Sequence, residues 1–166
     1  MSRSRLAGVV LVCAAGVAVA VWLWPPGDRR LIARQLEALA AAASTNETET
    51  ALVRAAAAAR VAGFFTDDVV LNLDGSGSPV SGRDGVMAVA AQARGVAGPL
   101  RVGVEDVRIA LEGPQDAAAY FTVTISGVDR GGGGLVDARE ISASFRKVGG
   151  AWLIARVDVL PTLERP

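Results

Sequence analysis

The 166 residues of this chain carry 17 Lys and Arg against 17 Asp and Glu, so there is no net charge to attract nucleic acid. Histidine is absent, which removes the side chain most often used for acid–base catalysis near neutral pH and the commonest metal ligand. Cys13 is the only cysteine and can form no disulfide within the chain. We expect one domain of about 130 residues with no metal, cofactor or nucleic-acid partner.

The first part of the chain is predicted to be a membrane anchor. Residues 6–24 form an uninterrupted apolar run. At about 1.5 Å per helical residue, this run just crosses a hydrocarbon core of about 30 Å. Two arginines precede the run and should stay cytoplasmic, and two tryptophans at its end suit the opposite interface. The sequence therefore predicts a single-pass anchor within residues 1–27, with a cytoplasmic N-terminus and an extracytoplasmic domain after it.

A cleaved signal peptide is the alternative for this segment. Ala18-Val19-Ala20 satisfies the small-x-small cleavage pattern, and cleavage after Ala20 would give a secreted domain. We favour the uncleaved anchor, because the apolar run continues past this position and ends in tryptophans. The domain is exported in both cases.

Three helices are predicted in the first half of the domain. Apolar residues recur at helical spacing over residues 28–43. Asn46 or Thr45 can cap a second helix over residues 47–62, whose run of five alanines allows close packing on a neighbour. A third helix is predicted over residues 84–93, before two glycines and a proline.

Residues 61–86 connect these helices to the predicted sheet. Phe64 and Phe65 should be buried at the corner where the second helix ends. A strand over residues 69–73 follows, and a loop rich in Gly, Ser and Pro then leads to the third helix. This segment is therefore expected to close the helices onto the sheet.

Four antiparallel strands are predicted for the rest of the chain, at residues 100–111, 119–127, 136–148 and 151–160. In the first strand the apolar alternation changes phase across Glu105-Asp106, which predicts a β-bulge. One face of the sheet is apolar and the other mixed, as in an antiparallel sheet covered by helices on one side. In the last strand, simple alternation predicts an inner face of Leu153, Ala155, Val157 and Val159 and an outer face of Trp152, Ile154, Arg156 and Asp158.

Three stretches carry a resemblance to a known superfamily: GFFTDDVVLNL at 63–73, SGRDGV at 81–86 and KVGGAWLIARVDV at 147–159. With the element order, they resemble the nuclear transport factor 2-like (NTF2-like) superfamily, which includes SnoaL-like polyketide cyclases and ketosteroid isomerases. The resemblance implies an α+β domain over residues 28–163, in which three helices wrap a curled antiparallel sheet into a cone. The transmembrane helix predicted from the apolar run precedes this domain. It does not specify the function, because this fold hosts isomerases, dehydratases and binding modules.

The inner face of the predicted cone is almost wholly apolar. The residues expected to line its pocket are Phe64, Phe65, Phe121, Val123, Ile141, Phe145 and Leu153. An isomerase-type site would need a carboxylate base there and donors to a developing oxyanion. The candidates are Asp67 or Asp68 as base and Arg83 or Arg139 as anion stabiliser. Structural roles are favoured for Asp67 and Asp68, since Asp commonly caps backbone N–H groups in turns, and for Arg83, which can pair with either of them. No catalytic residue is assigned.

The outer sheet face is predicted to bind a protein partner or a second copy of the chain. Tyr, Trp and Arg are enriched at interface hot spots. The predicted interface residues are Tyr120, Trp152, Arg156 and Asp158. The alternative is a solvated sheet face whose Arg–Asp pair is worth less than about 1 kcal/mol.

Taken with the anchor and the missing histidine, the apolar inner face favours one function. The sequence predicts a membrane-tethered, extracytoplasmic, non-catalytic domain that binds a partner protein or a small apolar ligand. The alternative is a SnoaL-like cyclase or isomerase that uses an aspartate base.

Overall fold

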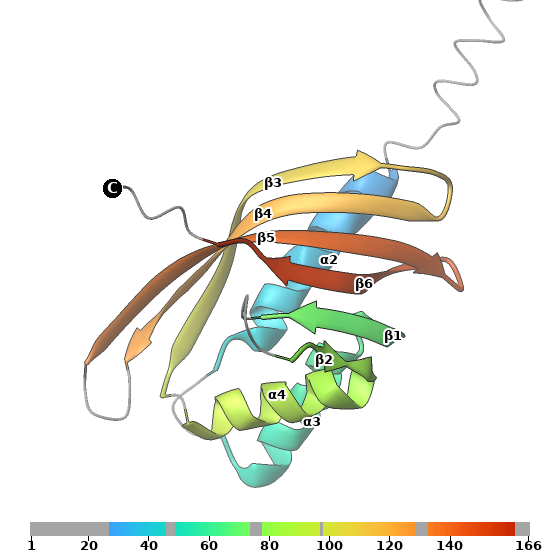
Figure 1. The fold of residues 1–166 in the computed structure, drawn as a ribbon. Helices are drawn as coiled ribbons and strands as arrows, with labels where there is room; N and C mark the ends of the chain where they lie inside the picture. Colours follow the sequence, from blue (N-terminus) through green and yellow to red (C-terminus); the bar gives the residue numbers. More distant parts are fainter. Residues whose placement is uncertain (1–26, 46–48, 74–77, 97, 129–132, 162–166) are drawn as a thin grey trace, which may run out of the picture.

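A computed structural model describes residues 27–45, 49–73, 78–96, 98–128 and 133–161 (Figure 1). Its elements are α2 (Gly27–Ala43), α3 (Ala51–Ala62), β1 (Phe65–Asn72), β2 (Val80–Ser81), α4 (Gly82–Val96), β3 (Leu100–Leu111), β4 (Asp116–Val128), β5 (Gly134–Val148) and β6 (Ala151–Val159). The predicted anchor lies outside the described residues. Within those ranges, no helix is long and apolar enough to cross a membrane.

The sheet has six strands in the order β2-β1-β6-β5-β4-β3. Strands β3 to β6 form the predicted antiparallel meander. The prediction of a wholly antiparallel sheet is wrong, because β1 pairs with β6 in parallel and β2 is a short additional edge strand. A parallel pair needs a long crossover, and here α4 and four strands, β2 to β5, separate β1 from β6 in the chain.

The three helices lie on the concave side of the curled sheet, where α2 contacts β3 and α4 contacts β1 (Figure 1). The predicted start of the second helix is wrong. Helix α3 begins at Ala51, and the Thr50 hydroxyl accepts a hydrogen bond from the Val53 N–H at 3.3 Å. Thr45, one of the two predicted caps, instead pairs with Leu100 at the start of β3, and its N–H donates to the Leu100 carbonyl at 2.8 Å.

The core lies between the helices and the concave face of the sheet. Ile32 and Leu36 of α2 are 0% and 1% exposed, and they share one cluster with Phe145 and Phe65. Phe65 is buried at the corner as predicted, whereas Phe64 is only partly buried and packs against the edge of the core. The corner between α3 and β1 therefore joins helices and sheet.

Two bulges decide which side chains face the core. The predicted bulge in β3 is confirmed, because the pairing with β4 shifts register between Glu105 and Arg108 and Asp106 has φ of 54°. After this bulge Ile109 packs toward the core and Arg108 is exposed.

A second bulge, in β6, was not predicted. Ser144 lies opposite Arg156 while Phe145 lies opposite Ile154, which leaves Ala155 as an extra residue. The phase of the first half of β6 is therefore reversed. The outward predictions for Trp152 and Ile154 are wrong, because these side chains are 2% and 1% exposed.

By the same alternation Leu153 lies on the outer face, so its predicted inward orientation is also wrong. Beyond the bulge, the inward prediction for Val157 and Val159 agrees with their packing against the core.

Candidate functional site

An apolar cavity lies between α2 and α4 on one side and the inner face of β1, β3 and β4 on the other. Its volume is about 410 Å³, which is within the range of small-molecule sites. Leu36 and Leu39 come from α2, Val86 and Ala90 from α4, and Phe121 from β4. The wall is therefore built by the same helix stripes and strand alternation that build the core.

Thr45 and Arg94 are the two polar residues among the described residues that line this cavity. The Thr45 hydroxyl donates to the Gly98 carbonyl at 2.8 Å and accepts from the Leu100 N–H at 2.8 Å. It has a single proton to donate. Thr45 thus fixes the start of β3 and has no proton left for a ligand.

Arg94 is also bound by the protein itself. Its side chain is 5% exposed, and Nη1 donates to both carboxylate oxygens of Glu49 at 2.8 and 2.9 Å. Nη2 donates to the carbonyls of Ala42 and of Ser44. Arg94 therefore ties the C-terminal end of α4 to the segment between α2 and α3.

The predicted pocket residues divide into two groups. Phe65, Phe121 and Val123 line the cavity. The remaining four residues lie elsewhere: Ile141 and Phe145 in the surrounding core, Phe64 at its edge and Leu153 on the outer face. Aromatic and aliphatic side chains from β1 and β4 thus shape the site, whereas β6 contributes none of the lining.

The four candidates for a catalytic role lie away from the cavity. The Asp67 side chain is 88% exposed and pairs with Arg83 at 2.9 Å, while Arg83 also donates to the Phe65 carbonyl. Arg139 is exposed and pairs with Asp137 at 3.0 Å.

Asp68 pairs with Arg146 at 3.0 Å. The Thr66 hydroxyl and then Arg146 hold the pKa of Asp68 below its usual range. A base in an apolar pocket would need the opposite shift. The geometry therefore gives no support to an aspartate base at either position.

Neither Arg94 nor Glu49 was predicted from the sequence as a residue of the site. A signal for Arg94 was present, since Val86, Ala90 and Arg94 are spaced four apart and therefore share one helix face. A charged residue on an apolar stripe must be buried with a partner or disturb the packing. No comparable signal marked Glu49, because its partner is distant in sequence.

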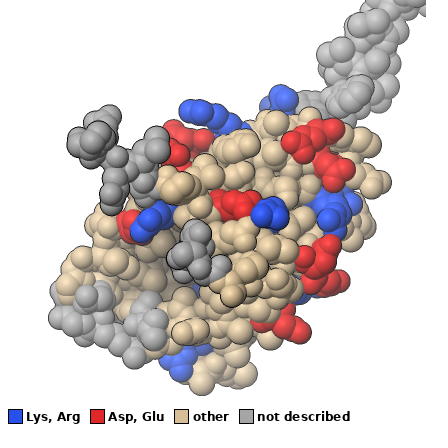
Figure 2. Space-filling view, in the orientation of Figure 1, with Lys and Arg blue, Asp and Glu red and all other residues tan. Residues whose placement is uncertain are grey.

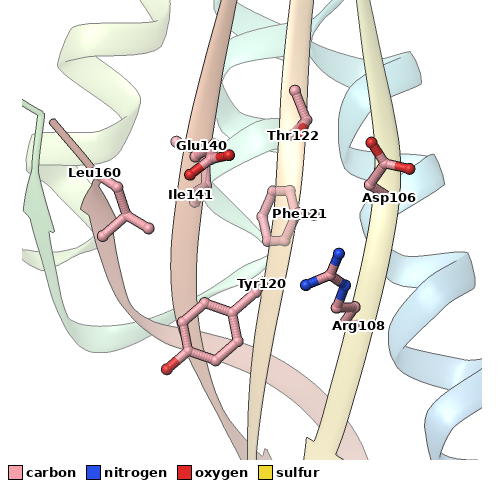
Figure 3. Close-up of a pocket in the computed structure, with 8 residues that line it drawn as sticks. All are labelled: Asp106, Arg108, Tyr120, Phe121, Thr122, Glu140, Ile141 and Leu160. Carbon is pink, nitrogen blue, oxygen red and sulfur yellow. The ribbon is translucent and has the colours of Figure 1, made fainter. Parts of the chain in front are cut away.

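A second, smaller hollow of about 220 Å³ lies on the outer sheet face (Figure 3). Asp106 and Arg108 reach it from β3, Tyr120 and Thr122 from β4, and Glu140 from β5. Within the described part of the chain, the three charged side chains of this set form no ion pair. The β3 bulge places Arg108 on this face.

The predicted interface residues have different environments. Tyr120 is 52% exposed on the outer face, as predicted from its phase. Arg156 pairs with Asp158 at 2.9 Å, and the guanidinium, followed by the Asn72 amide, lowers the pKa of Asp158. Trp152 is buried and donates its indole N–H to Asp28 at 3.0 Å, so it cannot contact a partner without unfolding.

Lys and Arg are interspersed with Asp and Glu on the visible surface (Figure 2). No extended field of one sign covers this view, in agreement with the balanced composition. Long-range electrostatic attraction of a polyanion is therefore not favoured by this surface.

Three helices on a curled mixed sheet with an internal cavity define an α+β domain of the NTF2-like class. A family model for the SnoaL-like domain matches residues 29–158, and the chain belongs to this family. Members of the family include isomerases, dehydratases and cyclases. None of the curated proteins matches the sequence.

Several solved structures share the fold. An NTF2-like protein with a cystatin-like fold from Novosphingobium aromaticivorans is 14% identical, with a TM-score of 0.67 over 91% of each chain. A type 2 hexachlorocyclohexane dehydrochlorinase is 13% identical, with a TM-score of 0.66 over 80% of this chain and 84% of that one.

A protein of unknown function from Mycobacterium tuberculosis is 21% identical, with a TM-score of 0.62 over 82% of this chain and 75% of that one. Identities this low establish a common fold and leave the activity to be argued from the site itself.

Proposed function

We propose that this domain binds a small apolar molecule without transforming it, on the outer side of a membrane to which residues 6–24 tether it. The observation that carries the proposal is the state of the two polar residues in the cavity wall. The Thr45 hydroxyl donates its only proton to the Gly98 carbonyl. Arg94 donates hydrogen bonds to Glu49 and to two backbone carbonyls.

A substrate in this cavity would meet no base and no free donor for a developing oxyanion from these two residues. Apolar side chains form the rest of the wall, and burying a ligand against them is favourable at about 25 cal/mol per Å². The chemistry of the wall therefore supports binding rather than turnover.

The tether is supported by the sequence. The apolar run ends at Trp24, and α2 begins at Gly27. Only two prolines separate them. A connection this short would hold the domain close to the membrane surface, where an apolar ligand is concentrated.

Binding can be tested with Nile red, a neutral apolar dye whose fluorescence rises on transfer from water. The described core residues, from Ile32 to Ile154, all follow the apolar run, so a chain of residues 27–166 keeps every core contact described above. We expect this chain to bind Nile red, and methyl dodecanoate to displace it.

Ala90→Leu should weaken Nile red binding about tenfold or more, because the added side chain fills the cavity. Ala88→Leu, on the exposed side of the same helix, is the matched control and should leave binding unchanged. Absence of Nile red binding by the wild type, or equal affinities of the wild type and Ala90→Leu, would rule the proposal out.

A second candidate function concerns the outer sheet face. Among the described residues, Arg108 forms no ion pair, and neither do Asp106 and Glu140, which line the same hollow beside the exposed ring of Tyr120. In a two-fold interface the same patch meets itself, so Arg108 of each copy could pair with Glu140 of the other. We propose a second copy of this chain as the partner.

Sedimentation velocity tests this association. The wild type should dimerise, Arg108→Glu should be monomeric, and Arg108→Glu combined with Glu140→Arg should recover the dimer. Arg101→Glu, an exposed position on the same strand outside the hollow, is the control. A wild type that stays monomeric as its concentration is raised rejects this candidate and leaves the ligand proposal intact.

A further inference from the structure

We infer that the cavity selects neutral apolar molecules over anionic amphiphiles such as fatty-acid anions, and that Glu49 sets this selectivity. This inference rests on the proposed function, because it names the class of ligand for the same cavity. The carrying observation is the ion pair between Arg94 and Glu49 at the cavity wall.

Arg94 is the one charged residue among the described residues that line the cavity. An uncompensated guanidinium there would bind a carboxylate through two parallel hydrogen bonds, which is its preferred geometry. A cavity with such a group at one end would favour fatty acids, with the chain in the apolar space and the carboxylate on Arg94.

Glu49 already occupies that position. Both of its carboxylate oxygens lie within 2.9 Å of Arg94 Nη1, and the side chains are 5% exposed for Arg94, which is buried, and 15% exposed for Glu49, which is partly buried. The pair carries no net charge. A ligand carboxylate would therefore have to displace Glu49 or remain unpaired in an apolar space, and both are costly.

The end of α2 adds to this discrimination. Nη2 of Arg94 donates to the carbonyls of Ala42 and Ser44, which lie at the C-terminal end of α2. Carbonyls at a helix C-terminus carry partial negative charge. An incoming anion thus meets the negative end of a helix beside a neutralised guanidinium.

A neutral ligand incurs none of these costs. The ligand class that fits is an uncharged, mainly apolar molecule that fills a volume of about 410 Å³, such as an ester or a hydrocarbon. The polar end of such a molecule needs no ionic partner in the wall.

The test measures displacement of Nile red from residues 27–166 at neutral pH by methyl dodecanoate and by dodecanoate. We expect the wild type to bind the ester at least about tenfold more tightly than the anion. Part of this difference would arise in any apolar cavity, because the anion is better hydrated.

The specific readout is therefore the change in Glu49→Gln. Glutamine keeps the size of the side chain and removes its charge, which leaves Arg94 free to attract the ligand carboxylate. Dodecanoate should bind about fivefold or more tightly to this variant than to the wild type, while methyl dodecanoate changes less than about twofold. Glu37→Gln, an exposed carboxylate on α2 outside the cavity, should behave like the wild type.

Retained ester binding in Glu49→Gln shows that the variant is folded, and an unchanged dodecanoate affinity then overturns the inference. If the variant does not fold, the affinities of the wild type still test the inference. Selection against anions is refuted if the wild type binds dodecanoate as tightly as it binds methyl dodecanoate. In that case the proposed function stands. If neither the ester nor Nile red binds the wild type, the proposed function and the inference both fail.

Discussion

Asp28 illustrates how one carboxylate can fix two elements. It lies in the first turn of α2 and accepts hydrogen bonds from Lys147 Nζ at 2.9 Å and from Trp152 Nε1 at 3.0 Å. Lys147 also lies over the Trp152 ring, 5.3 Å from its centre. Because a buried indole N–H needs an acceptor, Asp28 explains why Trp152 is part of the core.

Asp28→Ala should lower the free energy of unfolding by about 1–3 kcal/mol, since it leaves the buried Trp152 N–H without its acceptor. Urea unfolding monitored by circular dichroism measures this change. Asp67→Ala removes an ion pair whose carboxylate is 88% exposed and should cost less than about 1 kcal/mol. Equal effects of the two substitutions would contradict the role of Asp28.

The same carboxylate makes stability depend on pH. Lys147, and after it Trp152, lower the pKa of Asp28 in the folded protein. Between the folded and unfolded pKa values the unfolded chain binds more protons, so stability rises with pH. The contribution is complete above the unfolded value of about 3.9 and is lost as the pH falls through the lower folded value.

Urea unfolding at a series of acidic pH values tests this dependence. The wild type should lose stability as the pH falls below about 4, and Asp28→Asn should lose less, because its side chain does not titrate. Asp68 and Asp158 also have lowered pKa values, so some acid sensitivity should remain in the variant. Identical pH profiles would exclude the assigned role of Asp28.

At the scale of elements, Arg94 decides how α4 meets the segment between α2 and α3. Its guanidinium makes bonds to Glu49, Ala42 and Ser44, which are all remote from α4 in sequence. Helix α4 also forms one wall of the cavity through Val86 and Ala90. The orientation of that wall therefore depends on a buried ion pair as well as on apolar packing.

Arg94→Met should lower the free energy of unfolding by about 3 kcal/mol, because it leaves the partly buried Glu49 carboxylate without its partner. Arg94→Lys should recover only part of the loss, since an ammonium group cannot reproduce the forked geometry. The midpoint of urea unfolding gives both values. A loss below about 1 kcal/mol in Arg94→Met would mean that Glu49 reaches water when Arg94 is removed.

On the scale of the whole molecule, the domain is a curled mixed sheet closed on one side by three helices (Figure 1). The cavity exists because α2 and α4 both pack on the concave face with small and aliphatic side chains between them. The proposed tether concerns residues outside the described part of the chain and is tested separately.

The full chain should remain in the membrane pellet after extraction with alkaline carbonate, because the apolar run would be embedded in the bilayer. Leu11→Arg combined with Val17→Arg should release it, since each arginine costs about 2.5–3.5 kcal/mol at the centre of a helix that crosses a membrane. A soluble mature protein whose mass shows a first residue of Val21 would instead establish cleavage after Ala20.

The sequence by itself determined the order of the three helices and of the strands other than β2, the apolar inner face of β4 and β5 and the bulge in β3. These features depend on local periodicity, because apolar spacing and a phase change at Glu105-Asp106 are visible without knowing any partner. The burial of Phe65 and the exposure of Tyr120 follow from the same local patterns.

Only the tertiary structure decided the parallel pairing of β1 with β6, the burial of Trp152 and the neutralisation of Arg94 by Glu49. Each depends on residues that are far apart in the chain, and local periodicity contains no information about such partners. Trp152 was predicted on the wrong face because one extra residue in β6 reverses the alternation of its side chains. Asp28, which accepts the hydrogen bond from the buried Trp152 indole, lies at the other end of the domain in sequence. The neutralisation of the one charged residue in the described cavity wall likewise became visible only when Glu49 was found beside Arg94.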